Sequence, residues 1–504
     1  MAQGPAWEWA RTVNANDDEH VNDVMADRST NDVYIVGEWE KDLSAVFPVG
    51  ANPSSDFTNP YGDKDGFVAK YDSAGNFIWA FKLGGPNDDI TKSIAIDPDG
   101  NIYITGYFGS GTSYFSGTSP HTAPSTLDNS SGEDFYIAKY NSSGEFQWVR
   151  RSETNFGDLA GLDLYATSSA VFATGRHNAQ ATFGVLSMNN MPNQVDIFLI
   201  KYNLDGDEQW VAQCKSNGDD LAFGVIADDS SIYFTGSFDG STLGLSYPGG
   251  GNAASIVNGK SGTEDIFLAC YDVDGNYNWS QSISSSDHER AHDIAMDADS
   301  IYITGEINNN ASFPGYSGNP VTTSSGLDIF LSSHAKSNGN TGWVVLVSCT
   351  NDGAQRGRSI DTDGNGILYV TGDYNEDLLF PDGVTLSAAG DEDVFVASYT
   401  TNRAFRWALG AGSAHTEEGN GISAGSGGTI YLGGLYSDLM ALGPLTLPDD
   451  VLDNGYLAKL SESSPPENDN PCSAILLPVG DTCNAAVYDN LDATDSGIPD
   501  PGCG

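Results

Sequence analysis

The sequence has 504 residues, with 69 Asp and Glu against 21 Lys and Arg, and a formal charge of −48. Such a negative surface disfavours nucleic acid and anionic membranes as partners, because like charges repel. No apolar run reaches the roughly 18 residues of a membrane-spanning helix. The first residues, MAQGPAWEWA, lack a signal-peptide pattern. We interpret Ala2 or Gln3 as the start of the mature chain after signal removal, although a cytosolic protein would begin in the same way.

Internal repeats of about 60 to 70 residues follow one another from the first Trp strand onward. A Trp marks each of seven copies, at Trp9, Trp79, Trp148, Trp210, Trp279, Trp343 and Trp407. A Gly closes a Tyr-Ile-Thr-Gly-like segment in each copy, at Gly37, Gly106, Gly175, Gly236, Gly305, Gly372 and Gly434. An aromatic residue in an Asp-x-Phe-like segment also recurs, at Phe67, Tyr136, Phe198, Phe267, Phe330, Phe395 and Tyr456.

Each copy is expected to form four short strands, since apolar and polar residues alternate and turn residues separate the segments. In the second copy the strands are SIAID (93–97), NIYITGYF (101–108), DFYIAKY (134–140) and FQWVR (146–150). Tight turns at 97–100 and 141–144 join them in pairs. The sequence therefore predicts an all-β, seven-bladed β-propeller with four antiparallel strands per blade.

These repeats resemble the SBBP-type bacterial β-propeller repeat over residues 7–460. The resemblance implies that the SIAID-like strand lies innermost and the Trp strand outermost. Because the chain opens with a Trp strand, WEWART, and its last repeat strand, NGYLAKL, is of the Asp-x-Phe type, the N-terminal strand should complete the last blade. Such a closure leaves no open sheet edge.

The composition changes after Leu460. Residues 461–471 are expected to be a linker, and residues 472–504 resemble the beginning of a β-rich module of secreted Bacteroidota proteins exported by type IX secretion. Cys472, Cys483 and Cys503 cluster there and are the disulfide candidates, which indicates an oxidising compartment. We therefore expect a secreted or cell-surface protein that is part of a larger multidomain chain.

No phosphate-binding loop, His-Glu-x-x-His, Cys-x-x-Cys or Gly-x-Ser-x-Gly motif is present. We therefore expect no enzyme activity, no catalytic residues, no metal site and no cofactor. Asp-x-Asp-Gly strings at Asp97, Asp272 and Asp361, with a related string at Asn203, leave calcium open as an alternative. The same positions suit plain hairpin turns.

Strand order predicts that the long loops between second and third strands share one face with the connections between blades. Phe47, Phe115, Phe183, Phe313 and Phe380 recur in these loops and are interpreted as packing residues. The residues that break the repeat on this face are His288, Arg290, His292, Arg356 and Arg358. They are the candidate ligand-binding residues, because a positive spot suits a carboxylate or sulfate group; pairing with neighbouring acids is the alternative.

The leading hypothesis from the sequence is a non-catalytic extracellular recognition or adhesion module that binds a glycan or protein through the long-loop face. A passive spacer in a larger cell-surface protein is the first alternative. An enzyme acting on polysaccharide is the second. Neither nucleic acid nor membrane insertion is expected.

Overall fold

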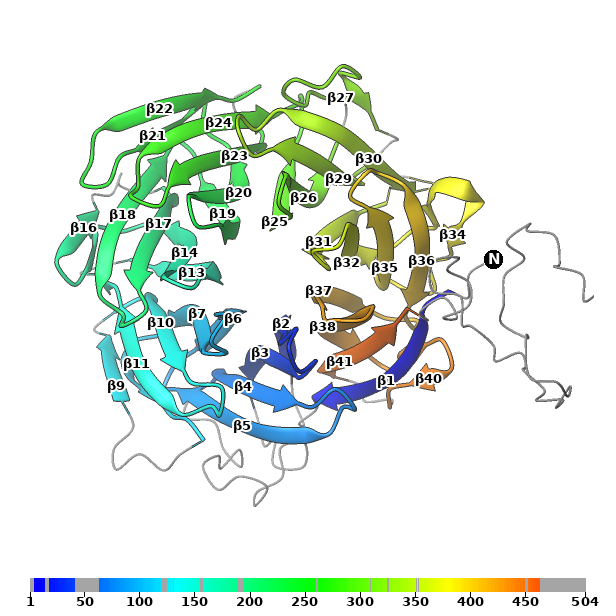
Figure 1. Cartoon of the computed structure of the whole chain (residues 1–504), viewed down its shortest axis with the longest axis horizontal. Helices are drawn as coiled ribbons and strands as arrows, with labels where there is room; N and C mark the ends of the chain where they lie inside the picture. Colours follow the sequence, from blue (N-terminus) through cyan, green and yellow to red (C-terminus); the bar gives the residue numbers. More distant parts are fainter. Residues whose placement is uncertain are drawn as a thin grey trace, which may run out of the picture.

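A computed structural model describes residues 4–13, 18–40, 63–118, 125–129, 131–154, 157–188, 194–259, 262–308, 310–323, 326–349, 351, 353–448 and 452–462. Its strands are arranged radially around a common centre (Figure 1). We call this central space, which contains a cavity lined by the inner strands, the channel. The only helical element among these residues is the 3-10 turn η1 (Pro381–Gly383). No helix within the described ranges has the length and hydrophobicity needed to cross a membrane.

Seven inner strands line the channel. They are β2 (His20–Ala26), β6 (Asp89–Ile96), β13 (Leu159–Ala166), β19 (Asp220–Ala227), β25 (Arg290–Met296), β31 (Gln355–Thr362) and β37 (Glu417–Ala424). Each contacts the next, and β37 contacts β2, so the ring is closed. The second strands are β3 (Val33–Trp39), β7 (Ile102–Phe108), β14 (Ala170–His177), β20 (Ser231–Phe238), β26 (Ser300–Ile307), β32 (Ile367–Tyr374) and β38 (Thr429–Ser437).

The third and fourth strands complete the radial sheets. The third strands are β4 (Asp65–Tyr71), β10 (Asp134–Tyr140), β17 (Asp196–Asn203), β23 (Asp265–Asp272), β29 (Asp328–Ala335), β35 (Asp393–Thr400) and β41 (Asp453–Ser461). The fourth strands are β5 (Phe77–Gly84), β11 (Phe146–Arg151), β18 (Glu208–Lys215), β24 (Tyr277–Ile283), β30 (Thr341–Cys349), β36 (Phe405–Ala411) and β1 (Ala6–Val13). The N-terminal β1 pairs antiparallel with β41, with Trp9 opposite Lys459 and Thr12 opposite Tyr456, which confirms the predicted closure.

The predicted number and size of the sheets are wrong. The described residues form eight sheets of three or more strands rather than seven, and three of the eight have six strands instead of four. Seven of these sheets contribute an inner strand to the channel. The eighth consists of β12 (Glu153–Thr154), β15 (Ala181–Phe183) and β16 (Leu186–Met188) and lies at the outer edge, with β16 against β18.

Except for β12, which follows the fourth strand β11, the additional strands come from the long connections between second and third strands. These connections fold into hairpins on the outer side of the preceding sheet. Three hairpins extend sheets to six strands: β8 (Gly111–Phe115) with β9 (Ser125–Asn129), β21 (Thr242–Ser246) with β22 (Asn252–Val257), and β33 (Leu378–Leu379) with β34 (Thr385–Leu386). Two form small separate sheets: β27 (Asn310–Ala311) with β28 (Val321–Thr322), and β39 (Ala441–Leu442) with β40 (Leu445–Thr446). These hairpins protect outer edges that would otherwise be open to pairing.

The recurrent loop phenylalanines are packing residues, as the sequence predicts. Phe115, Phe183, Phe313 and Phe380 are each 5% exposed or less, and their rings contact aromatic residues of the third strands, as in the 5.0 Å approach of Phe115 to Tyr136. Phe47 lies outside the described residues. The hairpins therefore carry apolar side chains that fasten one sheet to its neighbour.

The repeated Trp residues join successive sheets. In five fourth strands the Trp Nε1–H donates to a backbone carbonyl in the turn between third and fourth strands of the next sheet, as from Trp148 to Leu204 at 3.1 Å. In the last sheet those two strands, β41 and β1, are not joined by a turn. There the carboxylate of Glu462 takes the place of the turn carbonyl and accepts from Trp407 at 2.8 Å.

The repeated glycines have a steric cause. Every inner strand contains a β-bulge next to the residue that pairs with the glycine. The bulge directs a carbonyl oxygen at the glycine, so a Cβ on Gly236 would lie 2.0 Å from the oxygen of Leu221, with 1.8–2.0 Å at the other six. No side chain fits at this position.

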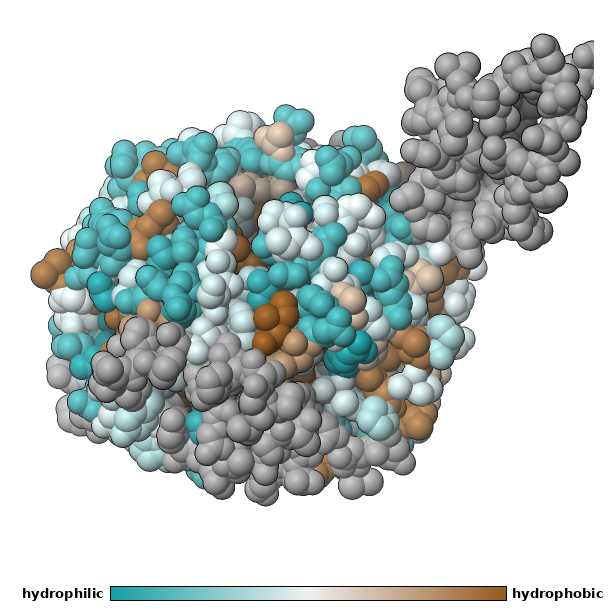
Figure 2. All heavy atoms as spheres, turned by 60° about the horizontal axis from the view of Figure 1, so that its bottom comes forward, coloured by the Kyte–Doolittle hydropathy of each residue, from teal (hydrophilic) through white to brown (hydrophobic). Residues whose placement is uncertain are grey.

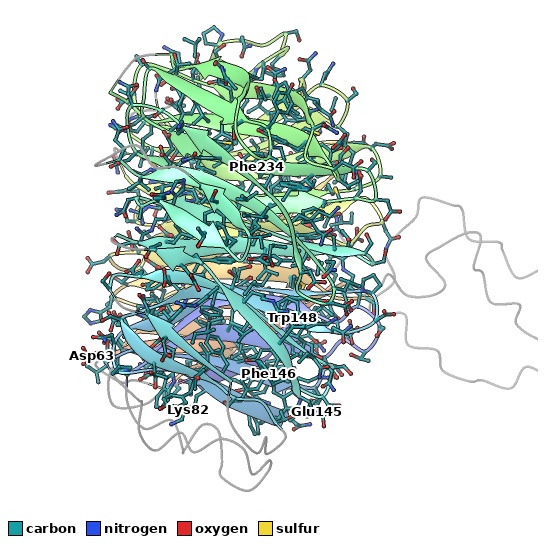
Figure 3. All side chains as sticks on the ribbon, turned by 90° about the vertical axis from the view of Figure 1, so that its left-hand side faces the viewer. Asp63, Lys82, Glu145, Phe146, Trp148 and Phe234 are labelled. Carbon is teal, nitrogen blue, oxygen red and sulfur yellow. The ribbon has the colours of Figure 1, made fainter. Side chains whose placement is uncertain are left out.

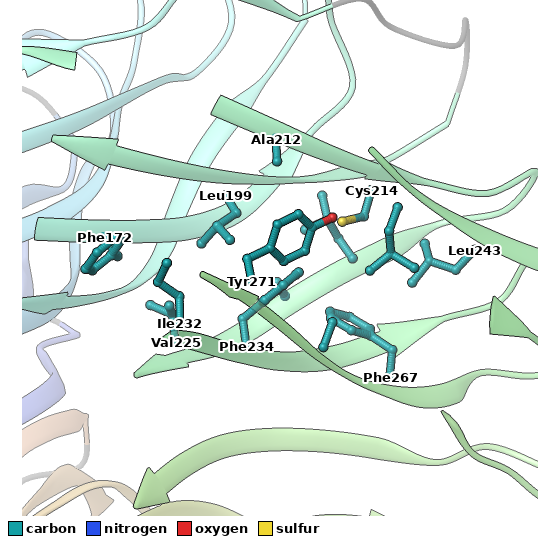
Figure 4. Packing of buried hydrophobic residues seen from close by; sticks show 14 of the residues in the cluster. Phe172, Leu199, Ala212, Cys214, Val225, Ile232, Phe234, Leu243, Phe267 and Tyr271 are labelled. Atoms are coloured by element: carbon teal, nitrogen blue, oxygen red, sulfur yellow. The ribbon is translucent and has the colours of Figure 1, made fainter. Parts of the chain in front are cut away.

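Apolar side chains fill the space between neighbouring sheets. In the cluster between the sheets of β18 and β23, the rings of Phe234 and Phe267 lie 5.4 Å apart and the Tyr271 hydroxyl points toward Cys214 (Figure 4). Cys214, Cys270 and Cys349 are buried free thiols on β18, β23 and β30. Cys472, Cys483 and Cys503 lie outside the described residues, as does the predicted module at 472–504.

The molecule has two faces of different character. The turn face carries the tight turns, such as the one containing Glu145, and the loop face carries the connections that lead into third strands, where Asp63 lies (Figure 3). The inner strands begin at the loop face and end at the turn face. Residues at the beginning of an inner strand therefore surround the loop-face opening of the channel.

Candidate functional site at the loop-face mouth

The structure brings the five candidate residues together at the beginning of two neighbouring inner strands. His288 precedes β25, which carries Arg290 and His292, and Arg356 and Arg358 lie on β31. Strands β25 and β31 contact each other around the channel. The predicted proximity of these residues is thus present in the fold.

The basic groups on and before β25 are paired with two carboxylates. Arg290 lies 2.5 Å from Glu264 and 3.9 Å from Glu306, and His288 lies 3.4 Å from Glu264. His292 Nε2 lies 2.7 Å from Glu306 Oε2. Although burial favours the neutral acid, His292 and Arg290 hold the pKa of Glu306 below its usual value.

The two arginines of β31 are also paired. Arg356 lies 3.3 Å from both Asp373 and Glu392, whereas Arg358 contacts Asp373 through Nε and lies 2.7 Å from Glu418. Asp373 is completely buried. Burial opposes the charge of Arg358, but Asp373 and Glu418 more than offset this and raise its pKa. These contacts correspond to the alternative in which neighbouring acids pair with the arginines.

We define the loop-face mouth as these ten residues: Glu264, His288, Arg290, His292, Glu306, Arg356, Arg358, Asp373, Glu392 and Glu418. Three guanidinium groups and two histidines face five carboxylates. The mouth is therefore a charged surface on which carboxylates outnumber guanidinium groups, five against three. The arginines alone suggested a positive spot, because their acidic partners are distant in sequence.

Sequence reasoning missed a second set of residues at this opening. The bulge leaves one unpaired residue on each inner strand, and all seven are partly exposed: Asn22, Lys92, Leu162, Phe223, His292, Arg358 and Asn420. Phe223 and His292 approach to 5.5 Å between ring centres. The only available signal was that this position differs in nature from copy to copy while its neighbours recur.

A cavity of about 910 Å³ lies in the channel toward the turn face and is lined by the later residues of the inner strands. Asp23, Asp163 and Asp293 lie in it, and each accepts a backbone N–H from a neighbouring inner strand, at 2.7–3.0 Å. Burial raises the pKa of Asp23 to about 7 and that of Asp163 to about 6. These carboxyl groups fasten inner strands to one another.

The Asp-rich strings considered for calcium form turns. Asp97 and Asp272 each accept the backbone N–H groups two and four residues later, and Asn203 does the same. Asp361 lies instead on β31 and pairs with Arg28. Within the described ranges, no three His, Cys, Asp or Glu side chains are grouped so that they could hold a metal ion.

Comparison with known proteins supports the repeat type. Residues 78–107, which span most of β5 through most of β7, match the beta-propeller repeat family SBBP. The chain is a β-propeller with an SBBP-type repeat. An uncharacterized WD repeat-containing protein, L264 of Acanthamoeba polyphaga mimivirus, is 24% identical over 428 residues, which are 72% of this chain and 29% of L264.

The regulatory protein FlaEY of Caulobacter vibrioides is 24% identical over 156 residues, 29% of this chain and 15% of FlaEY. This chain thus spans less than a third of the curated relatives that it matches. Among solved structures, BamB from Moraxella catarrhalis has a TM-score of 0.37 at 10% identity, covering 91% of this chain and 99% of BamB. The phage phi92 endosialidase has a TM-score of 0.38 at 9% identity, covering 91% and 70%.

Proposed function

We propose that this β-propeller is a non-catalytic interaction module that binds a basic protein surface at the loop-face mouth, in a secreted or cell-surface setting. The observation that carries the proposal is the excess of carboxylates over guanidinium groups at the mouth, five against three. A partner with Lys or Arg side chains would gain attraction and faster association there. The chain's overall charge of −48 adds to the same field.

The mouth keeps surface available for such a partner. The carboxylates of Glu392 and Glu418 are about a fifth exposed. A guanidinium from a partner can add to a partly exposed carboxylate without breaking a buried pair. Elsewhere the surface in Figure 2 is largely hydrophilic, with hydrophobic residues scattered among polar ones, so this view shows no broad apolar docking face.

The geometry favours a basic protein over an acidic glycan. Every guanidinium at the mouth already has a carboxylate within 3.3 Å, and an incoming anion would have to displace it. Exchanging the protein's own carboxylate for a ligand's anionic group gains little binding free energy, because the displaced carboxylate stays nearby and repels the ligand. The arginines therefore support the local structure, and the accessible carboxylates are the groups offered to a partner.

Three carboxyl groups with raised pKa values are placed where they cannot act on a substrate. Catalytic acids are raised in pKa but must reach the substrate. Here burial raises the pKa of Asp220, Glu289 and Glu417 to about 8, and all three have 0% exposure between the sheets. A polysaccharide could not reach them in the folded ring.

The test compares two triple variants with the same change of charge. Glu264→Gln with Glu392→Gln and Glu418→Gln alters the mouth, and Asp99→Asn with Asp205→Asn and Asp274→Asn alters exposed acids of the turn face. Binding to a panel of basic, neutral and acidic peptides and to a heparin oligosaccharide is measured by interferometry. The mouth variant should bind the basic peptides at least about tenfold more weakly than wild type, and the turn-face variant nearly as well.

Equal losses in both variants would reduce the effect to general charge attraction and contradict a site at the mouth. Binding of heparin that disappears in Arg356→Ala with Arg358→Ala would support an acidic glycan instead. Absence of any binding to the panel would favour a passive spacer. Retention of the thermal transition in each variant verifies that the fold is unchanged.

A further inference from the structure

Acidic side chains occupy the same position at successive boundaries between radial sheets. The first residue of a third strand lies beside the beginning of the next inner strand, and the backbones are joined there, as in the 2.8 Å bond from Glu417 N to the oxygen of Glu392. At four boundaries both positions carry a carboxyl group, and all eight residues are 0–1% exposed. Asp65 with Asp89 is one pair, in which burial raises the pKa of Asp89 to about 7. In the other three pairs the second acid has a pKa raised further, to about 8: Asp196 with Asp220, Asp265 with Glu289, and Asp393 with Glu417.

The donors around the Asp265 pair are neutral N–H and hydroxyl groups. Glu289 accepts from the backbone N–H of Ser285 at 3.0 Å and from its hydroxyl, and Asp265 accepts from the N–H of Gly259. The N–H of Asn308 also faces Glu289, and the two carboxyl groups lie within hydrogen-bonding contact. Among the described residues no N–H or hydroxyl donor bonds Oδ1 of Asp265.

The Asp393 pair has similar neutral donors, and the charge of Asp393 acts on Glu417. Glu417 accepts from the N–H of Ser413 at 2.8 Å and from its hydroxyl at 2.5 Å. Asp393 accepts from the N–H of Ala389 at 2.6 Å and from that of Gly390 at 3.4 Å, and its Oδ1 has no donor among the described residues. The other ionisable groups near this pair are Asp438, Tyr374 and Tyr456.

The Asp196 pair completes the set. Asp220 accepts from the N–H of Ser216 at 2.6 Å and from its hydroxyl at 2.7 Å. Gln213 donates to Asp196 at 3.4 Å, and the ionisable groups nearby are Asp239 and Cys214. At these three boundaries, neutral donors and further acids surround two buried carboxyl groups. Two ionised carboxylates in such surroundings would repel strongly.

We propose that each of these three boundaries retains one proton on one of its two carboxyl groups, so that singly protonated pairs fasten the ring and alkaline solution loosens it. The chain contains neutral counterparts of the same arrangement. At equivalent positions Gln355 stands beside Asp328, and Asn454 beside Glu19, again with 0% exposure. An amide has about the size of a protonated carboxyl group and carries no charge. The two amide-containing boundaries therefore have at most one negative charge, as an acid pair has after it binds one proton.

The direction of the pH dependence follows from burial. Burial and the second carboxylate raise the pKa of Asp220, Glu289 and Glu417 to about 8, whereas unfolded carboxyl groups titrate near 4. The folded chain therefore binds more protons over this interval, and its free energy of unfolding falls as the pH rises toward about 8. Buried His177 and His334, with pKa values lowered to about 4, act in the opposite direction only below about pH 6.5.

The experiment measures the melting temperature of the full chain between about pH 6.5 and pH 9. Wild type should lose roughly 5 °C or more over this range. Asp220→Asn with Glu289→Gln and Glu417→Gln, which fixes the neutral form, should lose less than half as much and melt above wild type at the alkaline end. The exposed triple Asp99→Asn, Asp205→Asn and Asp274→Asn should follow wild type.

A parallel decline of wild type and the buried triple, or a flat wild-type curve, would overturn the proposal. So would millimolar calcium that raises the alkaline melting temperature of wild type but not of the buried triple, because the pairs would then hold a cation. If the buried triple does not fold, the protonation state of the pairs is measured in wild type from the infrared carbonyl band of protonated carboxyl groups. A protonated-carboxyl band at neutral pH that disappears toward pH 9 supports the proposal, and its absence at neutral pH contradicts it.

Discussion

Deletion of residues 1–13 is expected to lower the melting temperature by more than about 10 °C. These residues contain β1, which covers the outer side of β41 and buries Trp7, Trp9 and Val13, each 8% exposed or less. Removal exposes the edge of β41 and the side of the β38 sheet, and it breaks the bond from Trp9 Nε1 to Ser73 in the next sheet. Both a strand pairing and an inter-sheet contact are lost.

Addition of a synthetic peptide with the sequence of residues 1–13 provides the control. Because β1 is the last strand of its sheet and is joined to β2 only through residues 14–19, the free peptide should bind the truncated chain and raise its melting temperature toward wild type. An unchanged melting temperature after the deletion would contradict closure by β1. Circular dichroism and calorimetry together measure both outcomes.

Gly236→Ala is the single substitution with the largest expected loss, about 3 kcal/mol or more of unfolding free energy. The new Cβ would lie 2.0 Å from the oxygen of Leu221 and 2.8 Å from the Cα of Ala222. Both atoms belong to the backbone at the bulge of β19, so relief requires the inner strand to move away from β20. Urea denaturation monitored by tryptophan fluorescence measures the loss.

Gly244→Ala is the matched control within a strand. Its Cβ would meet only Lys215 O at 3.5 Å and Asn252 Oδ1 at 3.7 Å, so its effect should stay within about 0.5 kcal/mol. If Gly236→Ala were as mild as Gly244→Ala, the steric account of the repeated glycines would be wrong. Loss of expression of Gly236→Ala alone, with normal expression of the control, would agree with it.

The repeat made most of the radial strands predictable from the sequence. Strands β6, β7, β10 and β11 include most of the four segments expected for the second copy, and β1 pairs with β41 as predicted. The alternation of apolar and polar side chains is a local signal, and so is the position of turn residues. Because both recur in every copy, they show where each strand begins and which of its side chains face the core. The role of Phe115 and its counterparts followed because a residue present in most copies usually serves packing.

The extra sheet and the hairpins were not predictable in this way. Strands such as β15 and β27 have only two or three residues, too few for alternation to reveal, and they pair within small sheets of their own. The bulges were also not predictable from the sequence, because the carbonyl oxygen that excludes a side chain at Gly236 belongs to another strand. The number of sheets therefore depended on pairings that composition and periodicity do not encode.

The sequence predicted that the candidate residues gather on one face, but it did not reveal the residues with which they pair. Arg356 and Arg358 stand out in an acidic chain, but Asp373, Glu392 and Glu418 pair with them from two different sheets. An acid 15 to 60 residues away gives no sequence signal among 69 acids. The charge balance at the mouth, and with it the proposed type of partner, required the structure.

The location of the contact surface is tested most directly by carbodiimide labelling of carboxyl groups with and without a bound basic peptide. Mass spectrometry then reports the labelling of Glu264, Glu392 and Glu418 at the mouth and of Asp99, Asp205 and Asp274 on the turn face. The proposed function predicts at least about fivefold protection of the mouth carboxylates and unchanged labelling of the turn face. Protection of the turn face, or equal protection of both faces, would contradict binding at the loop-face mouth.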